Sequence, residues 1–394
     1  MTEQRKEIHM EQMFPEVKKV FGFGCMRLPM KDGEVDLEEF SQMTELFLQK
    51  GFNYFDTAHG YLDGRSERAI REVLTSRHKR EEYILTNKLT SGFFEKEEDI
   101  RPFFENQLRW CGVDYFDFYL MHAQSASNYD KYRQCHAYET AFALKKEGKI
   151  RHVGLSFHDK PEMLDRILTD FPEVEIVQIQ FNYLDYTDPS VESRAVYDVA
   201  RKHGKPVIVM EPVKGGSLVN LPEDAQRIYD DLNVEMGTRY SNASYAIRFA
   251  AGFPGMRMVL SGMSNMQQLQ DNLSFMENFE PLSSREQEAV AGVMRVFGSL
   301  DMIPCTACHY CVEENHCPRH LRIPDLFACL NKKRIFNNWN MDYYYNNVLT
   351  VNAGKASDCI GCGGCERVCP QHLEIRRLLG EVAREFEKSR DAAD

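Results

Sequence analysis

Between Phe21 and about Glu280, short apolar and β-branched runs alternate with longer segments whose apolar residues recur at helical spacing. The short runs predict eight strands, at Gly22–Arg27, Asn53–Thr57, Tyr83–Lys88, Asp117–His122, His152–Ser156, Ile176–Phe181, Pro206–Glu211 and Met258–Gly262. The longer segments predict eight helices, at Leu37–Gln49, Ser66–Leu74, Lys96–Cys111, Lys131–Glu147, Lys160–Asp170, Ser190–Lys202, Ser241–Ala251 and Met266–Asn278.

The strand pattern indicates parallel strands that are covered on both faces. Val207–Met210 and Met258–Leu260 are apolar throughout and show no polar alternation. Strict alternation of strand and helix favours an α/β fold of the (β/α)8 TIM-barrel type over an open doubly wound sheet. The first predicted strand begins with Gly22-Phe23-Gly24-Cys25, which lacks the third glycine of a dinucleotide-binding Rossmann fingerprint and continues into Met-Arg-Leu-Pro.

A second region begins near Pro281. Ser283–Phe297 has the pattern of an amphipathic helix, and Arg376–Lys388 that of a terminal helix. Between them lies Asn337–Asn347, rich in Asn and Tyr, which we expect to be an ordered insertion. We therefore predict a barrel over residues 1–282 and a small α-rich domain over residues 283–394.

Composition and charge narrow the classes of partner. The chain of 394 residues is 43% hydrophobic and 27% charged, which is typical of globular proteins. Its formal net charge of −12 repels phosphate backbones and anionic lipid, so we expect neither a nucleic-acid nor a membrane partner. No apolar run is as long as a bilayer span, and Met1–Lys19 has no apolar core of a secretory signal, so we expect a cytoplasmic protein.

The cysteines point to iron–sulfur chemistry in the second region. One run reads Cys359-Ile-Gly-Cys362-Gly-Gly-Cys365-Glu-Arg-Val-Cys369-Pro370, which is the C-x2-C-x2-C-x3-C-P spacing of bacterial ferredoxins. The other run contains Cys305, Cys308, Cys311 and Cys317, with a longer gap before the last cysteine. In a reducing compartment such clusters of thiols indicate metal rather than disulfides.

We expect two [4Fe-4S] clusters in a ferredoxin-like domain, with the fourth cysteine of each run serving the other cluster. One cluster then has Cys305, Cys308, Cys311 and Cys369 as ligands, and the other has Cys359, Cys362, Cys365 and Cys317. A pair of structural zinc sites is the alternative, although zinc would leave the third, evenly spaced cysteine and the Cys-Pro step unexplained.

Four polar residues lie at or just beyond predicted strand ends: Asp56, Tyr61, Lys88 and His122. Catalytic residues of barrel enzymes occupy this position. A buried lysine would pair with Asp56, and its ammonium would stabilise a Tyr61 phenolate and make the phenol a usable proton donor. His122 could orient a carbonyl group, which suits protonation of a carbonyl oxygen while hydride arrives at carbon. A metal-dependent hydrolase with Asp56, His59 and His122 as ligands is the rival interpretation.

These residues stand in motifs that resemble the aldo/keto reductase family. The motifs are Asp56-Thr57-Ala58-His59-Gly60-Tyr61, Gly64-Arg65-Ser66-Glu67, Asn87-Lys88-Leu89 and Leu120-Met121-His122. The whole chain resembles the bacterial subgroup that carries a C-terminal two-cluster ferredoxin module. The resemblance implies that Tyr61 is the general acid, that Lys88 and Asp56 tune it, and that His122 orients a small aldehyde or ketone substrate, or the corresponding alcohol.

The resemblance also implies a nicotinamide cofactor. Ser156 and Gln178 match the carboxamide-binding positions, while Glu211 stands where many members stack an aromatic ring on the nicotinamide. The positions expected near the pyrophosphate and adenosine are Gly215, Gly216, Gly262, Ser264, Gln268 and Asn272. The last strand and its loop lack the Lys or Arg that usually meets a 2′-phosphate, so both NADH and NADPH remain open.

Three hypotheses connect the two halves of the chain. Hydride transfer moves two electrons at once, whereas an iron–sulfur cluster moves one. The chain could be a carbonyl reductase whose clusters are structural, sensory or a docking port for a redox partner protein. It could instead pass electrons from the clusters to the barrel, or be an electron-transfer protein whose barrel is idle or binds another redox cofactor. We expect Gln124–Arg133 and Leu221–Arg239 to be loops that line the substrate site.

Overall fold

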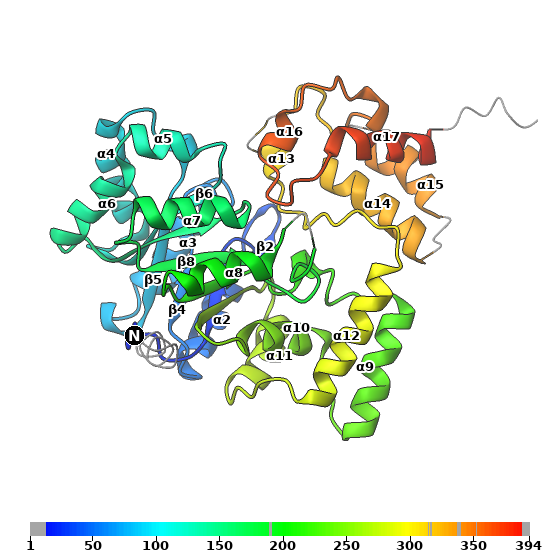
Figure 1. The fold of residues 1–394 in the computed structure, drawn as a ribbon, viewed down its shortest axis with the longest axis horizontal. Helices are drawn as coiled ribbons and strands as arrows, with labels where there is room; N and C mark the ends of the chain where they lie inside the picture. The colour runs from blue at the N-terminus through cyan, green and yellow to red at the C-terminus, as the bar shows by residue number, and fades with distance from the viewer. Residues whose placement is uncertain are drawn as a thin grey trace, which may run out of the picture. The chain divides into compact units, whose positions relative to one another are not determined.

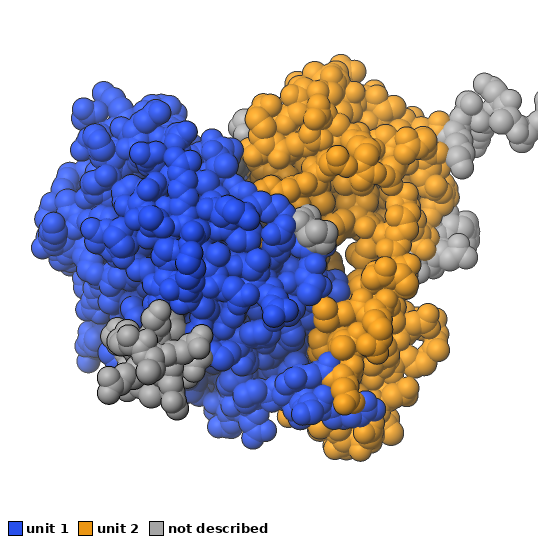
Figure 2. Space-filling model, viewed as in Figure 1, with its two compact units in different colours: residues 1–188, 192–213, 243–287 blue, residues 189–191, 214–242, 288–394 orange. Residues whose placement is uncertain are grey.

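A computed structural model describes residues 13–188, 191–313, 315, 317–336, 340–351 and 353–387. The chain forms two compact units (Figure 2). The first unit comprises Met1–Asp188, Glu192–Val213 and Ala243–Gln287, and the second comprises Pro189–Val191, Lys214–Asn242 and Glu288–Asp394. The boundary predicted between residues 282 and 283 remains a prediction, since the second unit also contains a segment from within the expected barrel.

The first unit contains a closed barrel of eight parallel strands in the order β1-β10-β9-β8-β7-β6-β5-β4. The strands are β1 (Phe21–Gly24), β4 (Tyr54–Asp56), β5 (Ile84–Leu89), β6 (Phe116–Gln124), β7 (Ile150–Phe157), β8 (Ile176–Gln180), β9 (Val207–Met210) and β10 (Met256–Gly262). Each coincides with a predicted strand to within a few residues, so the predicted barrel is confirmed.

Helices follow the strands on the outside of the barrel, as α7 and α8 do in Figure 1. They are α2 (Leu37–Gln49), α3 (Arg65–Ile70), α4 (Glu97–Cys111), α5 (Tyr129–Gln134), α6 (Ala137–Lys146), α7 (Pro161–Asp170), α8 (Ser193–Lys202), α10 (Asn242–Ala251) and α11 (Met266–Met276). The remaining short elements are the π-helical turn η1 (Arg71–Thr75), the 3-10 turns η2 (Arg80–Glu82) and η3 (Ser91–Phe93), and the hairpin β2 (Met30–Lys31) with β3 (Glu34–Val35).

Two predicted helices have a different form in the structure. The expected helix Lys131–Glu147 is divided into α5 and α6, because His136 takes a left-handed conformation with φ of 49°. The expected helix Ser66–Leu74 begins as α3 and widens into η1. Both departures keep the polypeptide on the outside of the barrel and leave the strand order unchanged.

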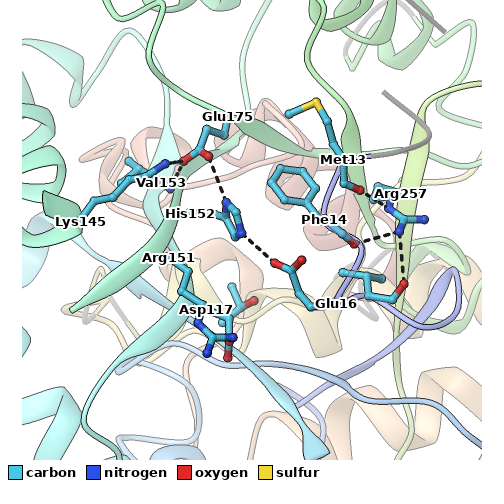
Figure 3. A network of polar contacts seen from close by, with 12 residues as sticks. Met13, Phe14, Glu16, Asp117, Lys145, Arg151, His152, Val153, Glu175 and Arg257 are labelled. Atoms are coloured by element: carbon cyan, nitrogen blue, oxygen red, sulfur yellow. Dashed lines mark hydrogen bonds and ion pairs between the residues drawn. The ribbon is translucent and has the colours of Figure 1, made fainter. Parts of the chain in front are cut away.

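A short segment before β1 closes the barrel at the amino ends of its strands (Figure 3). Phe14 and Val17 belong to the same buried cluster as strand residues that include Phe118 and Ile208. Arg257 donates hydrogen bonds to the carbonyl oxygens of Met13, Phe14 and Val17 at 2.9, 2.9 and 3.2 Å. His152, near the start of β7, bridges Glu16 and Glu175 at 2.7 and 3.0 Å. These few residues therefore cover the amino end of the barrel.

The second unit is mostly helical, as predicted. Its elements are the 3-10 turn η4 (Lys214–Gly216), α9 (Glu223–Met236), most of α12 (Ser284–Gly298), α13 (Tyr310–Glu313), α14 (Ile323–Phe336), α15 (Asn340–Tyr344), the π-helical turn η5 (Tyr345–Leu349), the 3-10 turn η6 (Ala356–Asp358), α16 (Gly364–Arg367) and α17 (Ile375–Phe386). Phe327, Tyr345, Leu379 and Val382 are central to its core.

Three expectations for this part of the chain can be compared with the structure, and one of them is wrong. Leu221–Arg239 was expected to be a loop, but most of it forms α9, whose Ala225, Tyr229 and Leu232 are buried at helical spacing. Part of the Asn-rich insertion, Asn340–Leu349, is helical; residues 337–339 lie outside the described part of the chain. The terminal helix ends at Phe386, and Lys388 lies outside the described part of the chain. Among the described residues, no helix combines the length and the apolar character needed to cross a bilayer.

Candidate active site and cysteine-lined cavities

Three neighbouring strands and one turn carry the predicted catalytic residues. Asp56 ends β4, Lys88 lies in β5 and His122 lies in β6, and the ladder pairs β4 with β5 and β5 with β6. Parallel strands in register bring their carboxyl ends to the same rim, so these side chains converge. The turn after β4 then brings Tyr61 back toward the same place.

Lys88 connects this group. Its ammonium lies 2.5 Å from Asp56 Oδ1, 2.9 Å from the Thr57 carbonyl oxygen and 3.1 Å from Tyr61 Oη. Lys88 and Asp56 are 1% and 3% exposed, so water does not weaken their attraction. Burial raises the pKa of Asp56 and lowers the pKa of Lys88, and the ion pair opposes both shifts. The arrangement keeps a cation against a phenolic oxygen in a site of low polarity.

His122 faces the same group from β6. Its ring centroid is 6.0 Å from that of Tyr61, and its Nδ1 lies 2.6 Å from Thr90 Oγ1. Burial holds the pKa of His122 well below its usual range, and the nearby charges of Lys88 and His158 lower the pKa further. The imidazole is therefore neutral near pH 7. Sequence reasoning missed Thr90, although it lies two residues beyond Lys88 and so shares its face of the strand.

A buried polar network lies behind Lys88. Asn87 Nδ2 donates to Glu67 Oε1 at 2.8 Å, and Gln107 Nε2 donates to the Lys88 carbonyl oxygen at 3.0 Å. His59 Nδ1 lies 2.6 Å from Glu67 Oε2, and its ring stacks on Trp110. His59 thus belongs to a structural network. Among the described residues, no three His, Cys, Asp or Glu side chains could hold a single metal ion, which argues against the hydrolase interpretation.

Ser156 and Gln178 are next to this site, on β7 and β8. Gln178 Nε2 donates to Asp56 Oδ2 at 3.5 Å, whereas its buried Oε1 has no hydrogen-bond partner in the described protein. Ser156 Oγ accepts from the Ala123 backbone N–H at 2.8 Å, which leaves its hydroxyl hydrogen for another acceptor. An unpaired buried oxygen is costly, so a bound N–H donor is expected at Gln178. A carboxamide supplies both a donor and an acceptor and fits this pair.

The residues predicted for the adenosine end form a cluster around the end of β10. The Ser264 backbone N–H donates to Gln268 Oε1 at 2.7 Å, and Ser264 Oγ donates to the Arg27 carbonyl oxygen at 3.1 Å. The Arg27 side chain covers Gly262. Asn272 is buried and donates to Ser261 Oγ at 2.9 Å, so it fixes the strand end. Sequence reasoning missed Arg27, a cation that follows the first strand.

Gly215 and Gly216 belong to the second unit, where they form part of η4. A Cβ added at Gly215 would lie 2.1 Å from the carbonyl oxygen of Thr306, next to Cys305, and Gly215 has φ of 63°. Gly216 has φ of 100° and an open surrounding. The glycine at position 215 therefore admits the backbone of the cysteine-bearing loop, and a contact with a pyrophosphate stays a prediction.

The eight clustered cysteines line two small cavities. Cys305, Cys308, Cys311 and Cys369 line the first cavity, and Cys317, Cys359, Cys362 and Cys365 line the second. The cysteines are thus exchanged between the two runs in the way that the ferredoxin spacing predicts. Among the described residues of these cavities, no three cysteines are placed to hold a single metal ion, which argues against the zinc alternative.

The fold and the site together define a (β/α)8 barrel with a lysine, an aspartate, a tyrosine and a histidine at its strand ends, joined to a helical module with two cysteine-lined cavities. Residues 20–294 match the model of the aldo/keto reductase family, and the chain belongs to this family. Residues 304–374 match the model of a 4Fe-4S dicluster domain, so the chain is an oxidoreductase-family barrel followed by an iron–sulfur domain.

Relatives resemble the barrel portion. Human aldo-keto reductase family 1 member C3 is 28% identical over 36% of this chain, and the chain spans about half (48%) of that relative's length. The uncharacterized oxidoreductase YqkF of Bacillus subtilis is 24% identical over 64% of this chain and 85% of its own. An aldo-keto reductase structure from Klebsiella pneumoniae in complex with NADPH has a TM-score of 0.55 at 20% identity, covering 71% of this chain and 90% of its own.

Proposed function

We propose that this protein transfers hydride between a nicotinamide dinucleotide and a small carbonyl compound, reducing an aldehyde or ketone or oxidising the alcohol. One observation carries the proposal: the buried Lys88 ammonium lies 3.1 Å from Tyr61 Oη and 2.5 Å from Asp56 Oδ1. A cation fixed beside a phenol favours loss of the phenolic proton, which is what protonation of a carbonyl oxygen requires.

Tyr61 is the proposed general acid. As negative charge grows on the carbonyl oxygen, Tyr61 gives its proton to that oxygen, and the Lys88 ammonium stabilises the phenolate that remains. Asp56 and the Thr57 carbonyl oxygen hold Lys88 in place, so little reorganisation is needed when the charge moves. In the reverse direction the phenolate accepts the proton of the alcohol.

His122 is the proposed orienting group. Since the imidazole is neutral and Thr90 can donate its hydroxyl hydrogen to Nδ1, the proton of His122 is assigned to Nε2. An Nε2–H donor beside Tyr61 can hold the substrate oxygen at the phenol. The Tyr61 hydroxyl and His122 Nε2–H would then both donate to the carbonyl oxygen of the substrate.

The cofactor proposal rests on the carboxamide fit. When bound, the nicotinamide supplies or accepts the hydride at the substrate carbon. Gln178 Oε1 would accept from its carboxamide and Ser156 Oγ would donate to it. The further predicted contacts of the dinucleotide are Gly215, Gly216, Gly262, Ser264, Gln268 and Asn272. We propose NADPH or NADH as the dinucleotide, because the residues of this chain favour neither; the Klebsiella pneumoniae relative is a complex with NADPH.

We further propose two [4Fe-4S] clusters, one in each cysteine-lined cavity, which exchange single electrons with a redox partner protein. The matching dicluster model and the four cysteines at each cavity support this assignment. Each thiolate set would supply one ligand per iron of a cubane. A cytoplasmic location and a small-molecule substrate remain parts of this proposal.

Replacing Tyr61 by Phe tests the proposal. We expect Tyr61→Phe to lower kcat/KM for aldehydes by about 10²- to 10⁴-fold, which is the usual contribution of a general acid. The Kd for NADPH or NADH should change less than about twofold, because the phenol makes no predicted contact with the dinucleotide. Steady-state kinetics and fluorescence titration measure the two effects in anaerobically purified protein.

The control is Tyr115→Phe, which removes a phenol that binds Arg151 at the far end of the barrel. It should leave both quantities unchanged. Turnover by Tyr61→Phe at more than a tenth of the wild-type rate would exclude the tyrosine as the acid. If the wild-type protein binds no nicotinamide nucleotide but contains iron and sulfide, the alternative of an electron-transfer protein with an idle barrel is favoured instead.

A further inference from the structure

The loop that carries Cys362 exposes the second cysteine-lined cavity to solvent. Of the eight cysteines at the two cavities, Cys362 is exposed to solvent, whereas the other seven are buried or partly buried. The adjacent Ile360 is 61% exposed. The ligands of the first cavity include the buried Cys311 and none that is exposed. A cluster in the second cavity would therefore be the one that approaches the surface.

Guanidinium groups surround this loop. Arg319, Arg367 and Arg376 are exposed. Arg319 Nε donates to the Asp358 carbonyl oxygen at 3.3 Å, and the guanidinium groups of Arg367 and Arg376 lie within 3.9 Å of the position that a Cβ would take at Gly363. These contacts hold three cations beside Cys362.

Carboxylates near the loop balance only part of this charge. Glu366 is paired with Arg376 at 2.7 Å, and Asp358 Oδ2 accepts from the Lys355 backbone N–H at 2.8 Å. Lys355 is itself exposed. Arg319, Arg367 and Lys355 form no ion pair among the described residues, so three exposed cations face solvent near Cys362. A cubane with its four thiolates would add a charge of about −2 beneath them, and the exposed cations would offset it at the surface of a chain whose formal net charge is −12.

We propose that Arg319, Ile360, Cys362 and Arg367 form a docking surface, the Cys362 patch, for a small acidic electron-carrier protein. This inference rests on the proposed clusters. An acidic carrier is repelled by the protein as a whole and attracted by the patch, so the field steers it to one place. The exposed Ile360 lies on the same loop as Cys362 and offers apolar contact beside these cations, as docking surfaces do.

The step at the patch is the transfer of one electron. A reduced carrier at the patch would lose one electron and be oxidised, a cluster held by the four cysteines of the second cavity would accept that electron, and no bond would form or break. The reverse transfer uses the same surface. The patch therefore assigns the entry and exit of electrons to the second cavity rather than the first.

The test measures the rate at which a reduced acidic flavodoxin or ferredoxin reduces the clusters, by anaerobic stopped-flow absorbance. In the wild-type protein the second-order rate should fall as salt is added, because salt screens attraction. The double variant Arg319→Glu/Arg367→Glu should react at least about tenfold more slowly, and its rate should rise with salt. The matched control Lys79→Glu/Lys146→Glu makes the same change of net charge on the barrel unit and should stay within about twofold of wild type.

Two further measurements separate the possible failures. Reduced methyl viologen is a cation, so its reaction should not slow in Arg319→Glu/Arg367→Glu; slowing with both donors would indicate a lowered cluster potential and would overturn the docking role. A wild-type rate that rises with salt, or equal slowing by both double variants, would also overturn it. Iron and sulfide analysis tests the clusters themselves: clusters without attraction refute the patch alone, and their absence refutes the proposed function.

Discussion

At the scale of single residues, Thr90 fixes the orientation of the His122 ring and the nitrogen that carries its proton. Its hydroxyl is the group found at Nδ1, 2.6 Å away, and Tyr132 Oη donates to the backbone carbonyl oxygen of His122 at 3.0 Å. One contact fixes the ring and the other fixes the strand. A neutral imidazole held in this way has a single defined donor for the substrate.

We expect Thr90→Val to lower kcat/KM for aldehydes by about tenfold, the equivalent of one lost hydrogen bond of ~1.4 kcal/mol. Valine keeps the shape of threonine but leaves Nδ1 without its donor, so the proton of His122 is no longer confined to Nε2. Steady-state kinetics provides the measurement. Thr90→Ser retains the hydroxyl and should restore most of the activity; equal losses in both variants would indicate a packing effect instead.

Sequence reasoning identified Asp56, Lys88, Tyr61 and His122 because parallel strands bring their carboxyl ends together, so strand ends alone place these side chains at one rim. It could not identify Thr90, or the unpaired oxygen of Gln178. Those depend on side-chain rotamers and on distances across neighbouring strands, which no linear pattern contains. It also could not foresee the hydrogen bond from Asn272 to Ser261, and a contact of Asn272 with the adenosine stays a prediction.

At the scale of elements, the segment around Phe14 depends on one histidine. Burial lowers the pKa of His152, but its hydrogen bonds to Glu16 and Glu175 outweigh burial and raise the pKa above the ordinary 6.5. The hydrogen bond from His152 is the main cause that lowers the pKa of Glu16 below its ordinary 4.5. Together they make the attachment of this segment dependent on pH.

Protonated His152 stabilises the folded protein fully below pH 6.5, and this contribution is lost as pH rises through its raised pKa. The contribution of Glu16 is present above pH 4.5 and is lost as pH falls below that. We therefore expect His152→Gln to lower the free energy of unfolding by about 1–3 kcal/mol between these two values, and by less at higher pH. Anaerobic urea unfolding followed by circular dichroism measures the difference.

The control is His136→Asn, which removes an exposed pair with Glu97. Solvent screens that pair, so its loss should change unfolding little at any pH. Asparagine also tolerates the left-handed backbone at position 136. A difference for His152→Gln that does not vary with pH would mean that packing of the ring against Phe14, rather than charge, holds the segment.

The close approach of Gly215 to Thr306 predicts that a larger residue at position 215 destabilises the loop that carries Cys305. Gly215→Ala should destabilise the loop that carries Cys305 by at least the ~1–3 kcal/mol of a non-glycine residue at positive φ, with the clash in addition. We expect the iron held by the first cavity to be lost faster to a chelator than that of the second. Gly237→Ala has a similar φ of 65° with no atom within 4 Å of the added Cβ, so it measures the backbone strain alone. Equal effects of the two variants would contradict the clash.

Element positions were predictable to a few residues because their periodicity is local. The strands and α2 follow from apolar spacing alone. The break between α5 and α6 was not predictable, because it depends on His136 adopting a left-handed conformation in the middle of a helical pattern. Helix α9 was taken for a loop, although Ala225, Tyr229 and Leu232 recur at helical spacing and are buried on one of its faces.

At the scale of the whole molecule, the two cysteine runs are interdependent. Cys369 should affect the cluster of the first cavity, although the other three cysteines of its own run line the second cavity. Cys369→Ser should therefore change the same electron paramagnetic resonance signal and the same reduction potential as Cys305→Ser. Cys317→Ser should in turn match Cys362→Ser. If Cys369→Ser instead matches Cys362→Ser, the exchange of ligands between the runs is wrong.

The exchange of cysteines has a consequence for biosynthesis. Neither run provides a full set of thiolates for either cavity, so a nascent chain that ends before Cys359 can complete no cubane, however much iron is present. Iron–sulfur donors would then have to meet this polypeptide only after its second cysteine run has been synthesised. A ribosome that stalls between Cys365 and Cys369 would release a product with one site ready for loading and the other a single thiolate short.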